Sequence, residues 1–420
     1  AQSSPLPGSL SIGLQKNTSS NIFLVATDAE NDPITFAIAS QPANGTVSLT
    51  GSYVVYTPTT DYVGTDSFTF TASDGSLTSS ATTVSLTVFN SFLSTATRIG
   101  QQLDGESTSD YFGQSVATSQ DGSRVVIGIY LDDGDGTYSD SGAVKVYEKT
   151  TTSTSTTWVQ LGVTIEGTAN SQNLGRAVAM SPDGNTIFMR AGSNTHVYRW
   201  INSAWVQLGG AINHSASQYN SLSSNFDGSN IAIASDTQVE VYQYVNASWS
   251  IKGATINQES SSDYSNAVAL SADGNTLAIG AYQNDGGGSD SGHVRIFGFE
   301  NGAWIQLGTD IDGDGASDYF GISVSLSADG STLAVGARYY DTESDNNRGS
   351  VQIYSRSLTG TSTLWTQKGE TLTGIANSDF FGSDTTLSAD GNILAVGAYN
   401  SNVNSSYSGQ VTLYHWKNSA

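Results

Sequence analysis

One motif recurs along the C-terminal three-quarters of the chain, and this recurrence limits the folds that are open to it. Its clearest copy reads DYFGISVSLSADGSTLAVGARYYD, and similar copies begin at Asp110, Asp263 and Asp379. Two weaker copies lie around Ser181–Gly184 and Asn225–Gly228. The copies are spaced by roughly 44 to 62 residues, which is the length of a four-stranded repeat unit. The sequence therefore predicts six copies of one structural unit.

Each copy divides into short strands separated by turn residues. We expect strand a at Ser323–Ser327, strand b at Thr332–Gly336, strand c at Ser350–Tyr354 and a Trp-bearing strand d such as Trp304–Leu307. Asp329-Gly330 predicts a tight turn between strands a and b, because Gly accepts the positive φ that such turns require. No stretch has a sustained 3.6-residue apolar period, so we expect very little helix. Radially repeated units of four antiparallel strands form a β-propeller, whereas a linear β-solenoid would have shorter and more regular coils.

The two ends of the repeat predict how the ring closes. The last copy ends at Tyr414–Trp416, in strand c, and has no strand d of its own. The segment Thr95–Gly100 has the pattern of a strand d, because Arg98-Ile99-Gly100 matches Gln306-Leu307-Gly308. We therefore expect this first strand to complete the last blade of a six-bladed propeller.

Residues 1–90 lack the motif and predict a separate domain. Their short alternating runs, divided by turn clusters, are typical of a β-sandwich of immunoglobulin-like type. The runs are Asn21–Ala26, Ile34–Ala39, Gly45–Leu49, Tyr53–Tyr56, Ser67–Ala72 and Thr82–Phe89. We therefore expect an all-β chain with a sandwich at residues 1–90 and a propeller at residues 91–420.

Two segments cover most of the N-terminal domain, TDAENDPITFAIASQPANGTVS and YVVYTPTTDYVGTDSFTFTASDG. In these segments the domain resembles the bacterial cadherin-like or Ig-like modules of large surface proteins. The resemblance implies a stalk module that calcium stiffens at the junctions between modules. The positions that would bind calcium are Asp28, Glu30, Asp32 and Asp74. Alternatively, these acidic residues only form Asx-turns beside Pro and Gly.

The repeating unit carries a Phe-Gly step before strand a and a Gly-Ala step at the end of strand b. The steps are Phe112-Gly113, Phe320-Gly321 and Phe381-Gly382, and Gly280-Ala281, Gly336-Ala337 and Gly397-Ala398. In these features the unit resembles FG-GAP repeats, which are known from integrin α-chains and many bacterial surface proteins. The resemblance implies an extracellular or cell-surface location. Integrin-type propellers have seven blades, so the count of six differs from that relative, and the fold alone does not define a function.

One acidic loop has the spacing of a calcium site. In the segment DIDGDGASD, carboxylates stand at positions 1, 3, 5 and 9, which are Asp310, Asp312, Asp314 and Asp318. Alternate oxygens can face one hard cation while the Gly at position 6 turns the chain. The loop lies between strands d and a, whereas the integrin relatives carry it between strands a and b, so their sites do not transfer by position. Alternatively, the carboxylates are solvated or cap the backbone, since Asp318 has a counterpart in three other copies.

The links between strands b and c are also acidic. In a four-stranded blade these links emerge on the same face as the d-to-a links, so one face of the propeller is rich in carboxylates. Copies two and three have very short b-to-c links, at Gly192–Asn194 and Ser235–Thr237. We expect the acidic rim to be low there and to leave a notch that a ligand could enter. The carboxylates of this candidate ligand face are Asp132, Asp133, Asp135, Asp140, Asp285, Asp290, Asp341 and Asp345.

Charge and residue usage exclude several function classes. A formal net charge of -23 and a pI near 4.1 argue against nucleic acid or an anionic membrane surface as partner. No run is long and apolar enough to insert into a membrane. The absence of Cys excludes a disulfide scaffold, a thiolate zinc site and a Cys nucleophile.

The sequence shows no catalytic constellation. The Ser-Ala-Asp-Gly turns are similar to the sialidase Asp-box but lack its Trp, and the Arg residues are scattered. The four His lie in separate copies, where His293 and His415 are assigned to packing in strand c. No G-x-S-x-G motif is evident. We therefore expect no enzyme activity, with a glycan-active hydrolase as the minor alternative.

These observations favour a non-enzymatic extracellular module that binds a glycan or a surface protein, with calcium as a stabilising cation. The alternative is a structural subunit that self-associates into an extracellular fibre or surface layer. The regularly spaced Trp residues of strand d are assigned to packing between blades rather than to sugar stacking. The chain opens at AQSS without Met, which signal-peptide removal or excision of a fragment would explain.

Overall fold

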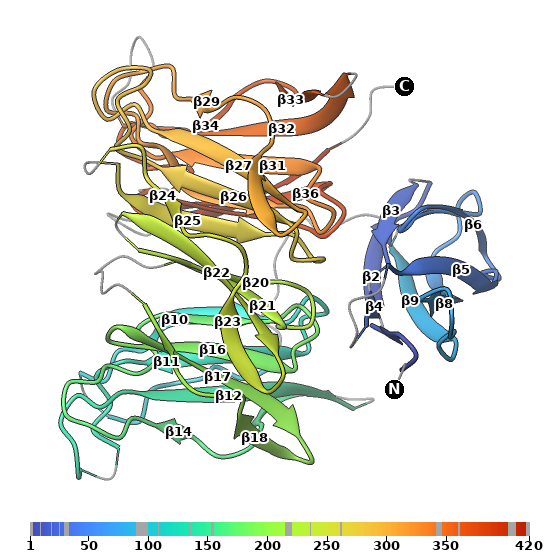
Figure 1. Cartoon of the computed structure of the whole chain (residues 1–420), viewed down its shortest axis with the longest axis horizontal. Helices are drawn as coiled ribbons and strands as arrows, with labels where there is room; N and C mark the ends of the chain where they lie inside the picture. Colours follow the sequence, from blue (N-terminus) through green and yellow to red (C-terminus); the bar gives the residue numbers. More distant parts are fainter. Residues whose placement is uncertain are drawn as a thin grey trace.

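The computed structural model describes the chain in several stretches. These are residues 3–8, 10–17, 19–24, 26–28, 33–89, 100–107, 109–134, 136–152, 155–214, 221–235, 237–260, 263–341, 347–359, 362–401 and 409–416. Every regular element in them is a β-strand (Figure 1). Within the same stretches, a helix with the length and hydropathy needed to cross a membrane is not found. The prediction of an all-β chain is confirmed.

The N-terminal domain is a sandwich of two main sheets. Its strands are β1 (Leu6–Pro7), β2 (Leu10–Gln15), β3 (Ser20–Phe23), β4 (Ala26–Thr27), β5 (Thr35–Ser40), β6 (Gly45–Thr50), β7 (Tyr53–Pro58), β8 (Gly64–Ser73) and β9 (Thr82–Phe89). The sheets have the orders β2-β9-β8-β5 and β3-β7-β6, and β1 pairs with β4. The fully buried rings of Tyr56, Phe68 and Phe70 belong to the core of this domain. Alternation along β8 places Phe68 and Phe70 inside, together with Asp66, which accepts the Tyr56 hydroxyl over 2.9 Å.

The sandwich differs from the prediction in two places. The predicted run Asn21–Ala26 is broken, because β3 ends at Phe23 and the backbone N–H of Leu24 donates to the carbonyl of Ser52. The strand β2, which pairs in parallel with β9, has no counterpart in the predicted runs. The predicted domain boundary, after residue 90, lies outside the described residues, since β9 ends at Phe89 and description resumes at Gly100.

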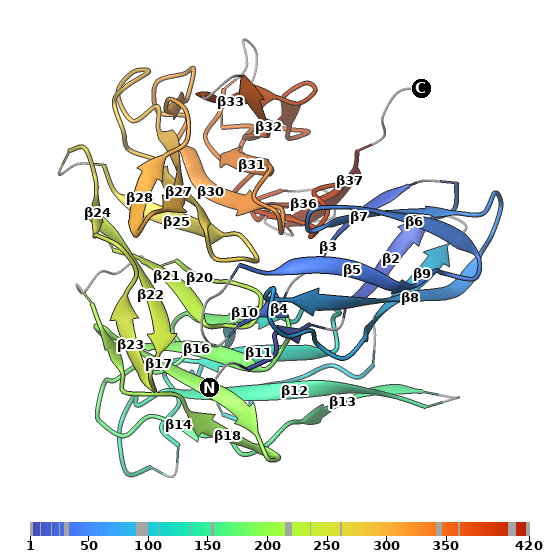
Figure 2. The same cartoon turned by 45° about the vertical axis from the view of Figure 1, so that its right-hand side comes forward.

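Residues from Phe112 onward form six sheets in the described part of the chain, the blades of a propeller (Figures 1 and 2). Blade 1 contains β10 (Phe112–Thr118), β11 (Arg124–Ile129), β12 (Ala143–Thr151), β13 (Thr156–Gln160) and β14 (Ile165–Glu166). Blade 2 contains β15 (Val178–Met180), β16 (Thr186–Ala191), β17 (Asn194–Ile201), β18 (Ala204–Gln207) and β19 (Ile212–Asn213). Blade 3 contains β20 (Leu222–Ser224), β21 (Asn230–Ala234), β22 (Gln238–Val245), β23 (Ser248–Ile251) and β24 (Ile256–Asn257).

The remaining blades repeat the same order. Blade 4 contains β25 (Ser265–Leu270), β26 (Thr276–Ala281), β27 (His293–Glu300), β28 (Ala303–Gln306) and β29 (Ile311–Asp312). Blade 5 contains β30 (Phe320–Leu326), β31 (Thr332–Ala337), β32 (Ser350–Thr359), β33 (Ser362–Gln367) and β34 (Leu372–Thr373). Blade 6 contains β35 (Asp384–Leu387), β36 (Ile393–Ala398) and β37 (Gln410–His415). The first strands of neighbouring blades contact one another, so strand a forms the inner edge of each blade.

Each of the first five blades also has a short fifth strand that the sequence did not predict. In blade 4, β28 pairs only with the second half of β27, from Phe297 to Glu300. The first two residues of β27, His293 and Val294, therefore have an open edge, which β29 fills. Backbone groups of the d-to-a link find partners in this way. As a result, the acidic segment 310–318 begins in a strand rather than in a free loop.

The strand expected to close the ring lies mostly outside the described residues. Blade 6 has three strands in the described part of the chain, and residues 95–99 are not described. Gly100, the last residue of the predicted closing strand, lies against the Trp158 indole of blade 1. Gly308 at the end of strand d of blade 4 lies against the Trp365 indole of blade 5 in the same way.

The Phe-Gly and Gly-Ala steps meet at the seams between blades. Gly336 of the Gly-Ala step in blade 5 lies against the carbonyl of Gly382, which belongs to the Phe-Gly step of blade 6. Gly280 of blade 4 and Gly321 of blade 5 make the same contact. Gly382 has a φ of +84°, a left-handed conformation in which Gly has no Cβ penalty. The two halves of the motif are therefore one seam, in which two backbones approach without a side chain between them.

The Asp-Gly turns between strands a and b are closed by their own side chains. In blade 6 the Ser388 hydroxyl donates to the Asp390 carboxylate over 2.5 Å, and the N–H of Asn392 donates to the same oxygen over 3.0 Å. The Ser388 oxygen also accepts the N–H of Ile393 over 2.9 Å. The turns of the other blades repeat this arrangement, with Asn225 replacing the Ser in blade 3. The turn Asp is thus a structural residue in every blade.

Backbone hydrogen bonds join these turns from blade to blade. The N–H of Phe226 donates to the carbonyl of Ala272 over 3.0 Å, Ala272 donates to Ala328 over 2.8 Å, and Ala328 donates to Ala389 over 2.8 Å. Blades 1 to 3 are joined by two further bonds of the same kind, Gln120 to Pro182 and Asp183 to Phe226. We call this series the turn belt.

The N-terminal domain docks on the turn belt. The ring of Phe226 joins the core of that domain, and Gly8 lies so close to it that an added Cβ would overlap the ring. Tyr53 donates its hydroxyl to Asp329, and Ser20 donates to the second carboxylate oxygen of Asp390 over 2.9 Å. The turn carboxylates thus close their own turns and also hold the neighbouring domain.

Candidate functional site

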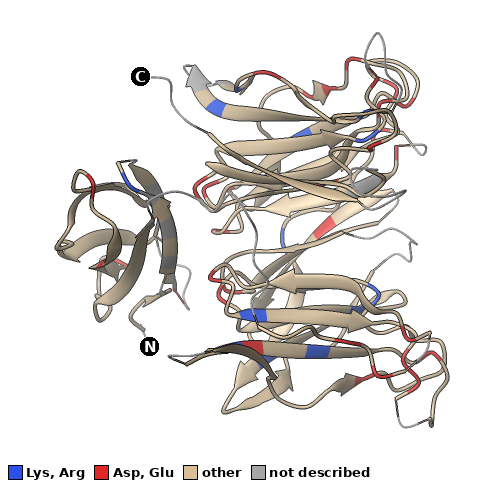
Figure 3. Ribbon diagram, turned by 180° about the vertical axis from the view of Figure 1, so that it is seen from behind, with Lys and Arg blue, Asp and Glu red and all other residues tan. Residues whose placement is uncertain are grey.

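The docked domain leaves the opposite face of the propeller, with its b-to-c and d-to-a links, as the candidate functional surface. Figure 3 shows the N-terminal domain on one side of the blades and a concentration of acidic residues at the loops on the other. As expected, the b-to-c links of blades 2 and 3 are short, since β16 ends at Ala191 and β17 begins at Asn194, and β21 ends at Ala234 and β22 begins at Gln238. We call this surface the loop-rich face.

The predicted calcium loop does not bring its four carboxylates together. In the described residues, no three of Asp310, Asp312, Asp314 and Asp318 place one oxygen each within 4.8 Å of one another. Asp310 accepts a hydrogen bond from the Gln306 amide over 2.5 Å. Asp312 belongs to β29, Asp314 is exposed and Asp318 is buried. Calcium binding by this loop stays a prediction.

Asp318 and its counterparts in other blades turn towards backbone N–H groups. Asp318 receives hydrogen bonds from the backbone of Gly315 and Asp341. The carboxylate of Asp379 accepts the N–H groups of Ile375 and Ala376 over 3.0 and 2.8 Å. This is the geometry of a carboxylate that caps the d-to-a link. Burial and the nearby carboxylates of Asp341 and Asp314 raise the pKa of Asp318 to about 6.

Replacing Asp318 by Asn is expected to remove a pH dependence of stability. Because the pKa of Asp318 is higher in the folded chain than its ordinary value of 3.8, the folded state binds the proton more tightly. The stabilisation is complete below the ordinary pKa and is lost as the pH rises through about 6. Relative to Asp318→Asn, the native protein should lose on the order of 2–3 kcal/mol between pH 3.5 and pH 7. Urea unfolding at both pH values measures this, with the exposed Asp312→Asn as control; parallel pH profiles for native protein and Asp318→Asn would contradict it.

The carboxylates of the b-to-c links also serve their own loops. Asp285 accepts the N–H of Asp290 over 2.8 Å. In the same way Asp133 accepts the N–H of Asp140 over 2.7 Å, and Asp341 accepts that of Asn347 over 2.6 Å. Asp132 accepts the N–H of Gly134 over 2.5 Å. Asp135 and Asp345 lie outside the described residues.

The acidic residues of the N-terminal domain are only partly described. Asp74 accepts the N–H groups of Ser76 and Leu77, each over 2.6 Å, which is an Asx-turn. Asp28 is half-buried. Glu30 and Asp32 lie outside the described residues. Asp74 therefore has the geometry of the alternative interpretation, in which these acidic residues form Asx-turns.

Sequence reasoning missed an arc of aromatic rings on the loop-rich face. Tyr282, Tyr319, Tyr339, Phe380 and Tyr399 contact one another in this order, with ring centroids 5.0, 4.8, 5.2 and 5.4 Å apart. They come alternately from the end of strand b and the start of strand a, so they lie at the inner edges of blades 4 to 6. We call these five residues the aromatic arc.

Charged groups flank the aromatic arc. The guanidinium carbon of Arg338 lies 4.8 Å from the Tyr339 ring centroid and 5.8 Å from that of Tyr319, a cation–π arrangement. Burial and the carboxylate of Asp290 raise the pKa of the Tyr319 phenol, so its hydroxyl stays protonated as a hydrogen-bond donor. Tyr399 at the end of the arc is 54% exposed. The other four rings are half-buried, so the arc offers part of its aromatic surface to solvent beside charged groups of both signs.

The backbone at the start of strand a makes the aromatic residues unexpected. Tyr319 and Phe380 have φ values of +59° and +54°, and Tyr111 of blade 1 has +56°. A bulky side chain rarely adopts this left-handed conformation, and strain of this kind collects at functional sites. Blade 2 has Asn173 at the same position with a φ of +53°, and Asn adopts this conformation at lower cost. Tyr264 of blade 4 stands at the same position but is not among the residues with a positive φ. The fold therefore does not require this conformation in every described blade, and the strained rings of blades 5 and 6 indicate a role at the surface.

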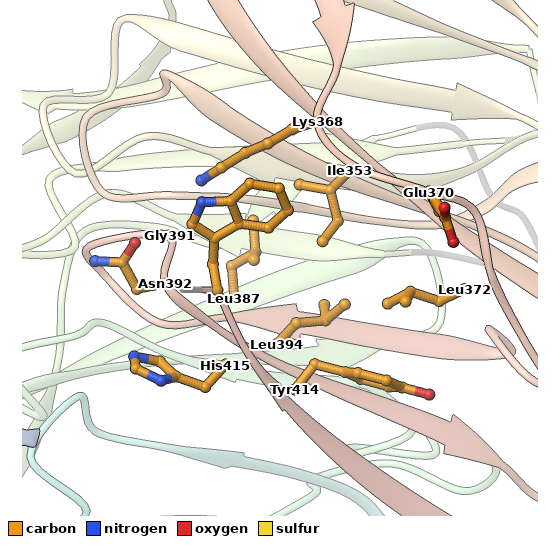
Figure 4. A pocket seen from close by; sticks show the side chains of 11 residues that line it. Ile353, Lys368, Glu370, Leu372, Leu387, Gly391, Asn392, Leu394, Tyr414 and His415 are labelled. Carbon is orange, nitrogen blue, oxygen red and sulfur yellow. The ribbon is translucent and has the colours of Figure 1, made fainter. Parts of the chain in front are cut away.

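A cavity of about 270 Å³ lies between blades 5 and 6 (Figure 4). It is lined by Lys368 and Trp416, whose ammonium and ring are 4.5 Å apart, together with Tyr414, Glu370 and seven other residues. Lys368 stands at the end of strand d in blade 5, where blade 4 has Leu307. The carbonyl of Leu307 accepts the indole N–H of Trp365 in blade 5 over 3.0 Å. The last copy has Ala96 at the position of this Trp in the sequence, and residues 95–99 lie outside the described residues.

Comparisons with known proteins agree with this architecture. A family model described as bacterial Ig domain matches residues 3–87, and one described as FG-GAP repeat matches residues 104–147 and 309–354. The chain therefore carries a bacterial Ig domain followed by an FG-GAP β-propeller. Domains of these two kinds are typical of extracellular and surface proteins. Among curated proteins, no match to this chain is found.

Several solved structures share part of the architecture. A protein from Lactobacillus plantarum is 15% identical and has a TM-score of 0.47, covering 73% of this chain and 81% of its own. The periplasmic gluconolactonase of Pseudomonas aeruginosa is 17% identical with a TM-score of 0.42, covering 72% of this chain and 85% of its own. Hsv2 of Kluyveromyces lactis is 11% identical with a TM-score of 0.44, covering 69% and 70%. At these values, the likenesses carry no argument about function.

Proposed function

We propose that this chain is a non-enzymatic binding module of the cell surface that holds a glycan on the aromatic arc of its propeller. The observation that carries the proposal is the series of five contacting rings, two of them in left-handed backbone conformations. Aromatic faces stack against the apolar faces of sugar rings, and neighbouring polar groups bind the hydroxyls. The carboxylates and Arg338 beside the arc supply such groups.

The position of the N-terminal domain supports a role in presentation. This domain docks on the turn belt, which leaves the loop-rich face open to solvent. The short b-to-c links of blades 2 and 3 lower the rim on one side of this face. A long ligand could therefore reach the aromatic arc from that side. Calcium, in this proposal, orders the acidic links around the arc.

The test is a glycan array probed with the whole chain. We expect hits that weaken about fivefold or more in the double variant Tyr339→Ala/Tyr399→Ala, because two stacked rings together contribute roughly 1–3 kcal/mol. Tyr138→Ala is the matched control, since Tyr138 is an exposed Tyr of the loop-rich face outside the arc. If calcium orders the links, a chelator should also reduce the hits.

Three other outcomes would contradict this proposal. Fibres or sheets in micrographs of the purified chain, with no array hits, would favour the structural subunit that self-associates. Hits that the double variant and Tyr138→Ala reduce equally would contradict a site on the aromatic arc. Hydrolysis of an arrayed glycan would contradict the non-enzymatic assignment.

A further inference from the structure

A second cluster of ligand-type side chains lies in blade 4, away from the aromatic arc. Glu259, His293 and Asp310 each place one ligand atom within 4.8 Å of the others. Nδ1 of His293 is 3.8 Å from an Asp310 carboxylate oxygen. The three residues come from separate segments, which are the link before blade 4, the start of β27 and the link after β28. The fold, rather than one loop, brings them together.

In the described part of the chain, the buried imidazole of His293 makes no hydrogen bond at Nε2. Its side chain is 1% exposed. Nδ1 points at Asp310 from beyond hydrogen-bond distance. A buried ring nitrogen without a hydrogen bond costs free energy, and Nδ1 is the nitrogen beside Asp310 whose lone pair a cation could take. Burial away from water favours the neutral ring, and a neutral imidazole can bind a metal ion through one ring nitrogen.

The other blades lack this combination. The residue paired with the end of strand b is His293 in blade 4, but Ala143, Asn194, Ser350 and Gln410 in blades 1, 2, 5 and 6. Asp310 stands two residues after the Gly that ends strand d, where the other blades have Thr164, Ala211, Thr255 and Thr371. Repeat packing therefore requires neither His293 nor Asp310.

Glu259 forms an ion pair that has a counterpart in blade 1, and this ion pair contributes to the net charge of the cluster. It pairs with Arg295 over 3.7 Å, as Glu106 of blade 1 pairs with Lys145 over 2.6 Å. Two carboxylates and one guanidinium leave the cluster with one net negative charge. The second Asp310 oxygen accepts the Gln306 amide, which orients the carboxylate as outer groups orient the ligands of metal sites.

We infer that Glu259, His293 and Asp310 bind a divalent transition-metal ion, with zinc as the ion that best suits one imidazole and two carboxylates. Calcium prefers all-oxygen sites, whereas imidazole with carboxylate is a common zinc ligand set. Three protein ligands leave a fourth position of a tetrahedral ion open. This site is separate from the aromatic arc, so the proposed glycan binding can fail without affecting it.

The test is calorimetric titration of the metal-stripped whole chain with Zn²⁺. We expect one site, which Asp310→Asn and Glu259→Gln weaken at least about tenfold and His293→Ala abolishes. Glu300→Gln, which changes an exposed carboxylate at the far end of β27, is the matched control and should bind as the native chain does. Co²⁺ in place of Zn²⁺ should give visible absorption bands that Asp310→Asn removes.

A folding defect can be separated from a loss of ligands. His293 is buried, so its replacement by Ala can destabilise blade 4, whereas Asp310→Asn preserves side-chain volume in a partly exposed residue. Thermal unfolding without metal should be equal for the native chain and Asp310→Asn, and Zn²⁺ should raise the midpoint of the native chain only. Absence of Zn²⁺ binding, or equal binding by Asp310→Asn and the native chain, would overturn the inference.

Discussion

Gly336→Ala is expected to destabilise the propeller by about 3 kcal/mol or more, because the new methyl group would overlap the carbonyl oxygen of Gly382 in the next blade. The overlap is with backbone, so no side-chain rotation relieves it. The seam can only open, and the hydrogen bond of 2.9 Å from the Ser323 hydroxyl to that carbonyl is then lost. Urea and thermal unfolding followed by circular dichroism would measure the effect.

Gly210→Ala is the control for this substitution. Gly210 has open space around the position of its Cβ and a φ outside the left-handed region, so the same chemical change should stay within about 0.5 kcal/mol. Equal unfolding midpoints for the two variants would show that the blades tolerate a wider seam. They would also show that the Phe-Gly and Gly-Ala steps have another role.

Phe226→Ala is expected to uncouple the N-terminal domain from the propeller. The Phe226 ring belongs to the core of that domain although it comes from a turn of blade 3. Removing a buried Phe side chain costs about 3–5 kcal/mol in a core, and here the loss falls on the contact between domains. The turn itself should survive, because the turns of blades 4 to 6 carry Ala at this position.

Calorimetry should then resolve a separate, earlier transition for the N-terminal domain. Small-angle scattering should show a larger radius of gyration as the two domains move apart. Gln120→Ala changes the same turn position in blade 1, where the side chain is exposed and away from the docked core, so it should leave both measurements unchanged. A single transition at the native midpoint in Phe226→Ala would contradict the docking contact.

The sequence predicted what local patterns determine. Alternating apolar residues predict the blade strands, and Gly after Asp predicts the turns between them. The strands expected at Ser323–Ser327 and Thr332–Gly336 lie within β30 and β31, apart from Ser327. Ser327 lies beyond β30 because its hydroxyl closes the turn. The Phe-Gly and Gly-Ala steps were recognised as a motif, but their meeting across a seam follows from blade packing.

The candidate sites depend on contacts between separate segments of the chain. The sequence could not predict these contacts. Tyr282 and Tyr319 lie far apart in the chain and meet only because strand b of one blade faces strand a of the next. One signal was available, since an aromatic residue follows the recurring Asp in the copies that begin at Asp110, Asp263 and Asp379. His293 was assigned to packing, which its burial supports, but the lack of a partner for its Nε2 among the described residues emerges only from the structure.

The turn belt has a consequence for how such a chain can change over evolutionary time. Its bonds use only main-chain groups, so adjacent blades stay joined whatever side chains the turns carry. At Pro182, which has no N–H, the neighbouring Asp183 donates to Phe226 over 3.2 Å in its place. Copies two and three could therefore lose most of the motif and remain in the ring. A tolerant turn belt leaves individual blades free to acquire features that the others lack, such as the docking Phe of blade 3 and the histidine cluster of blade 4.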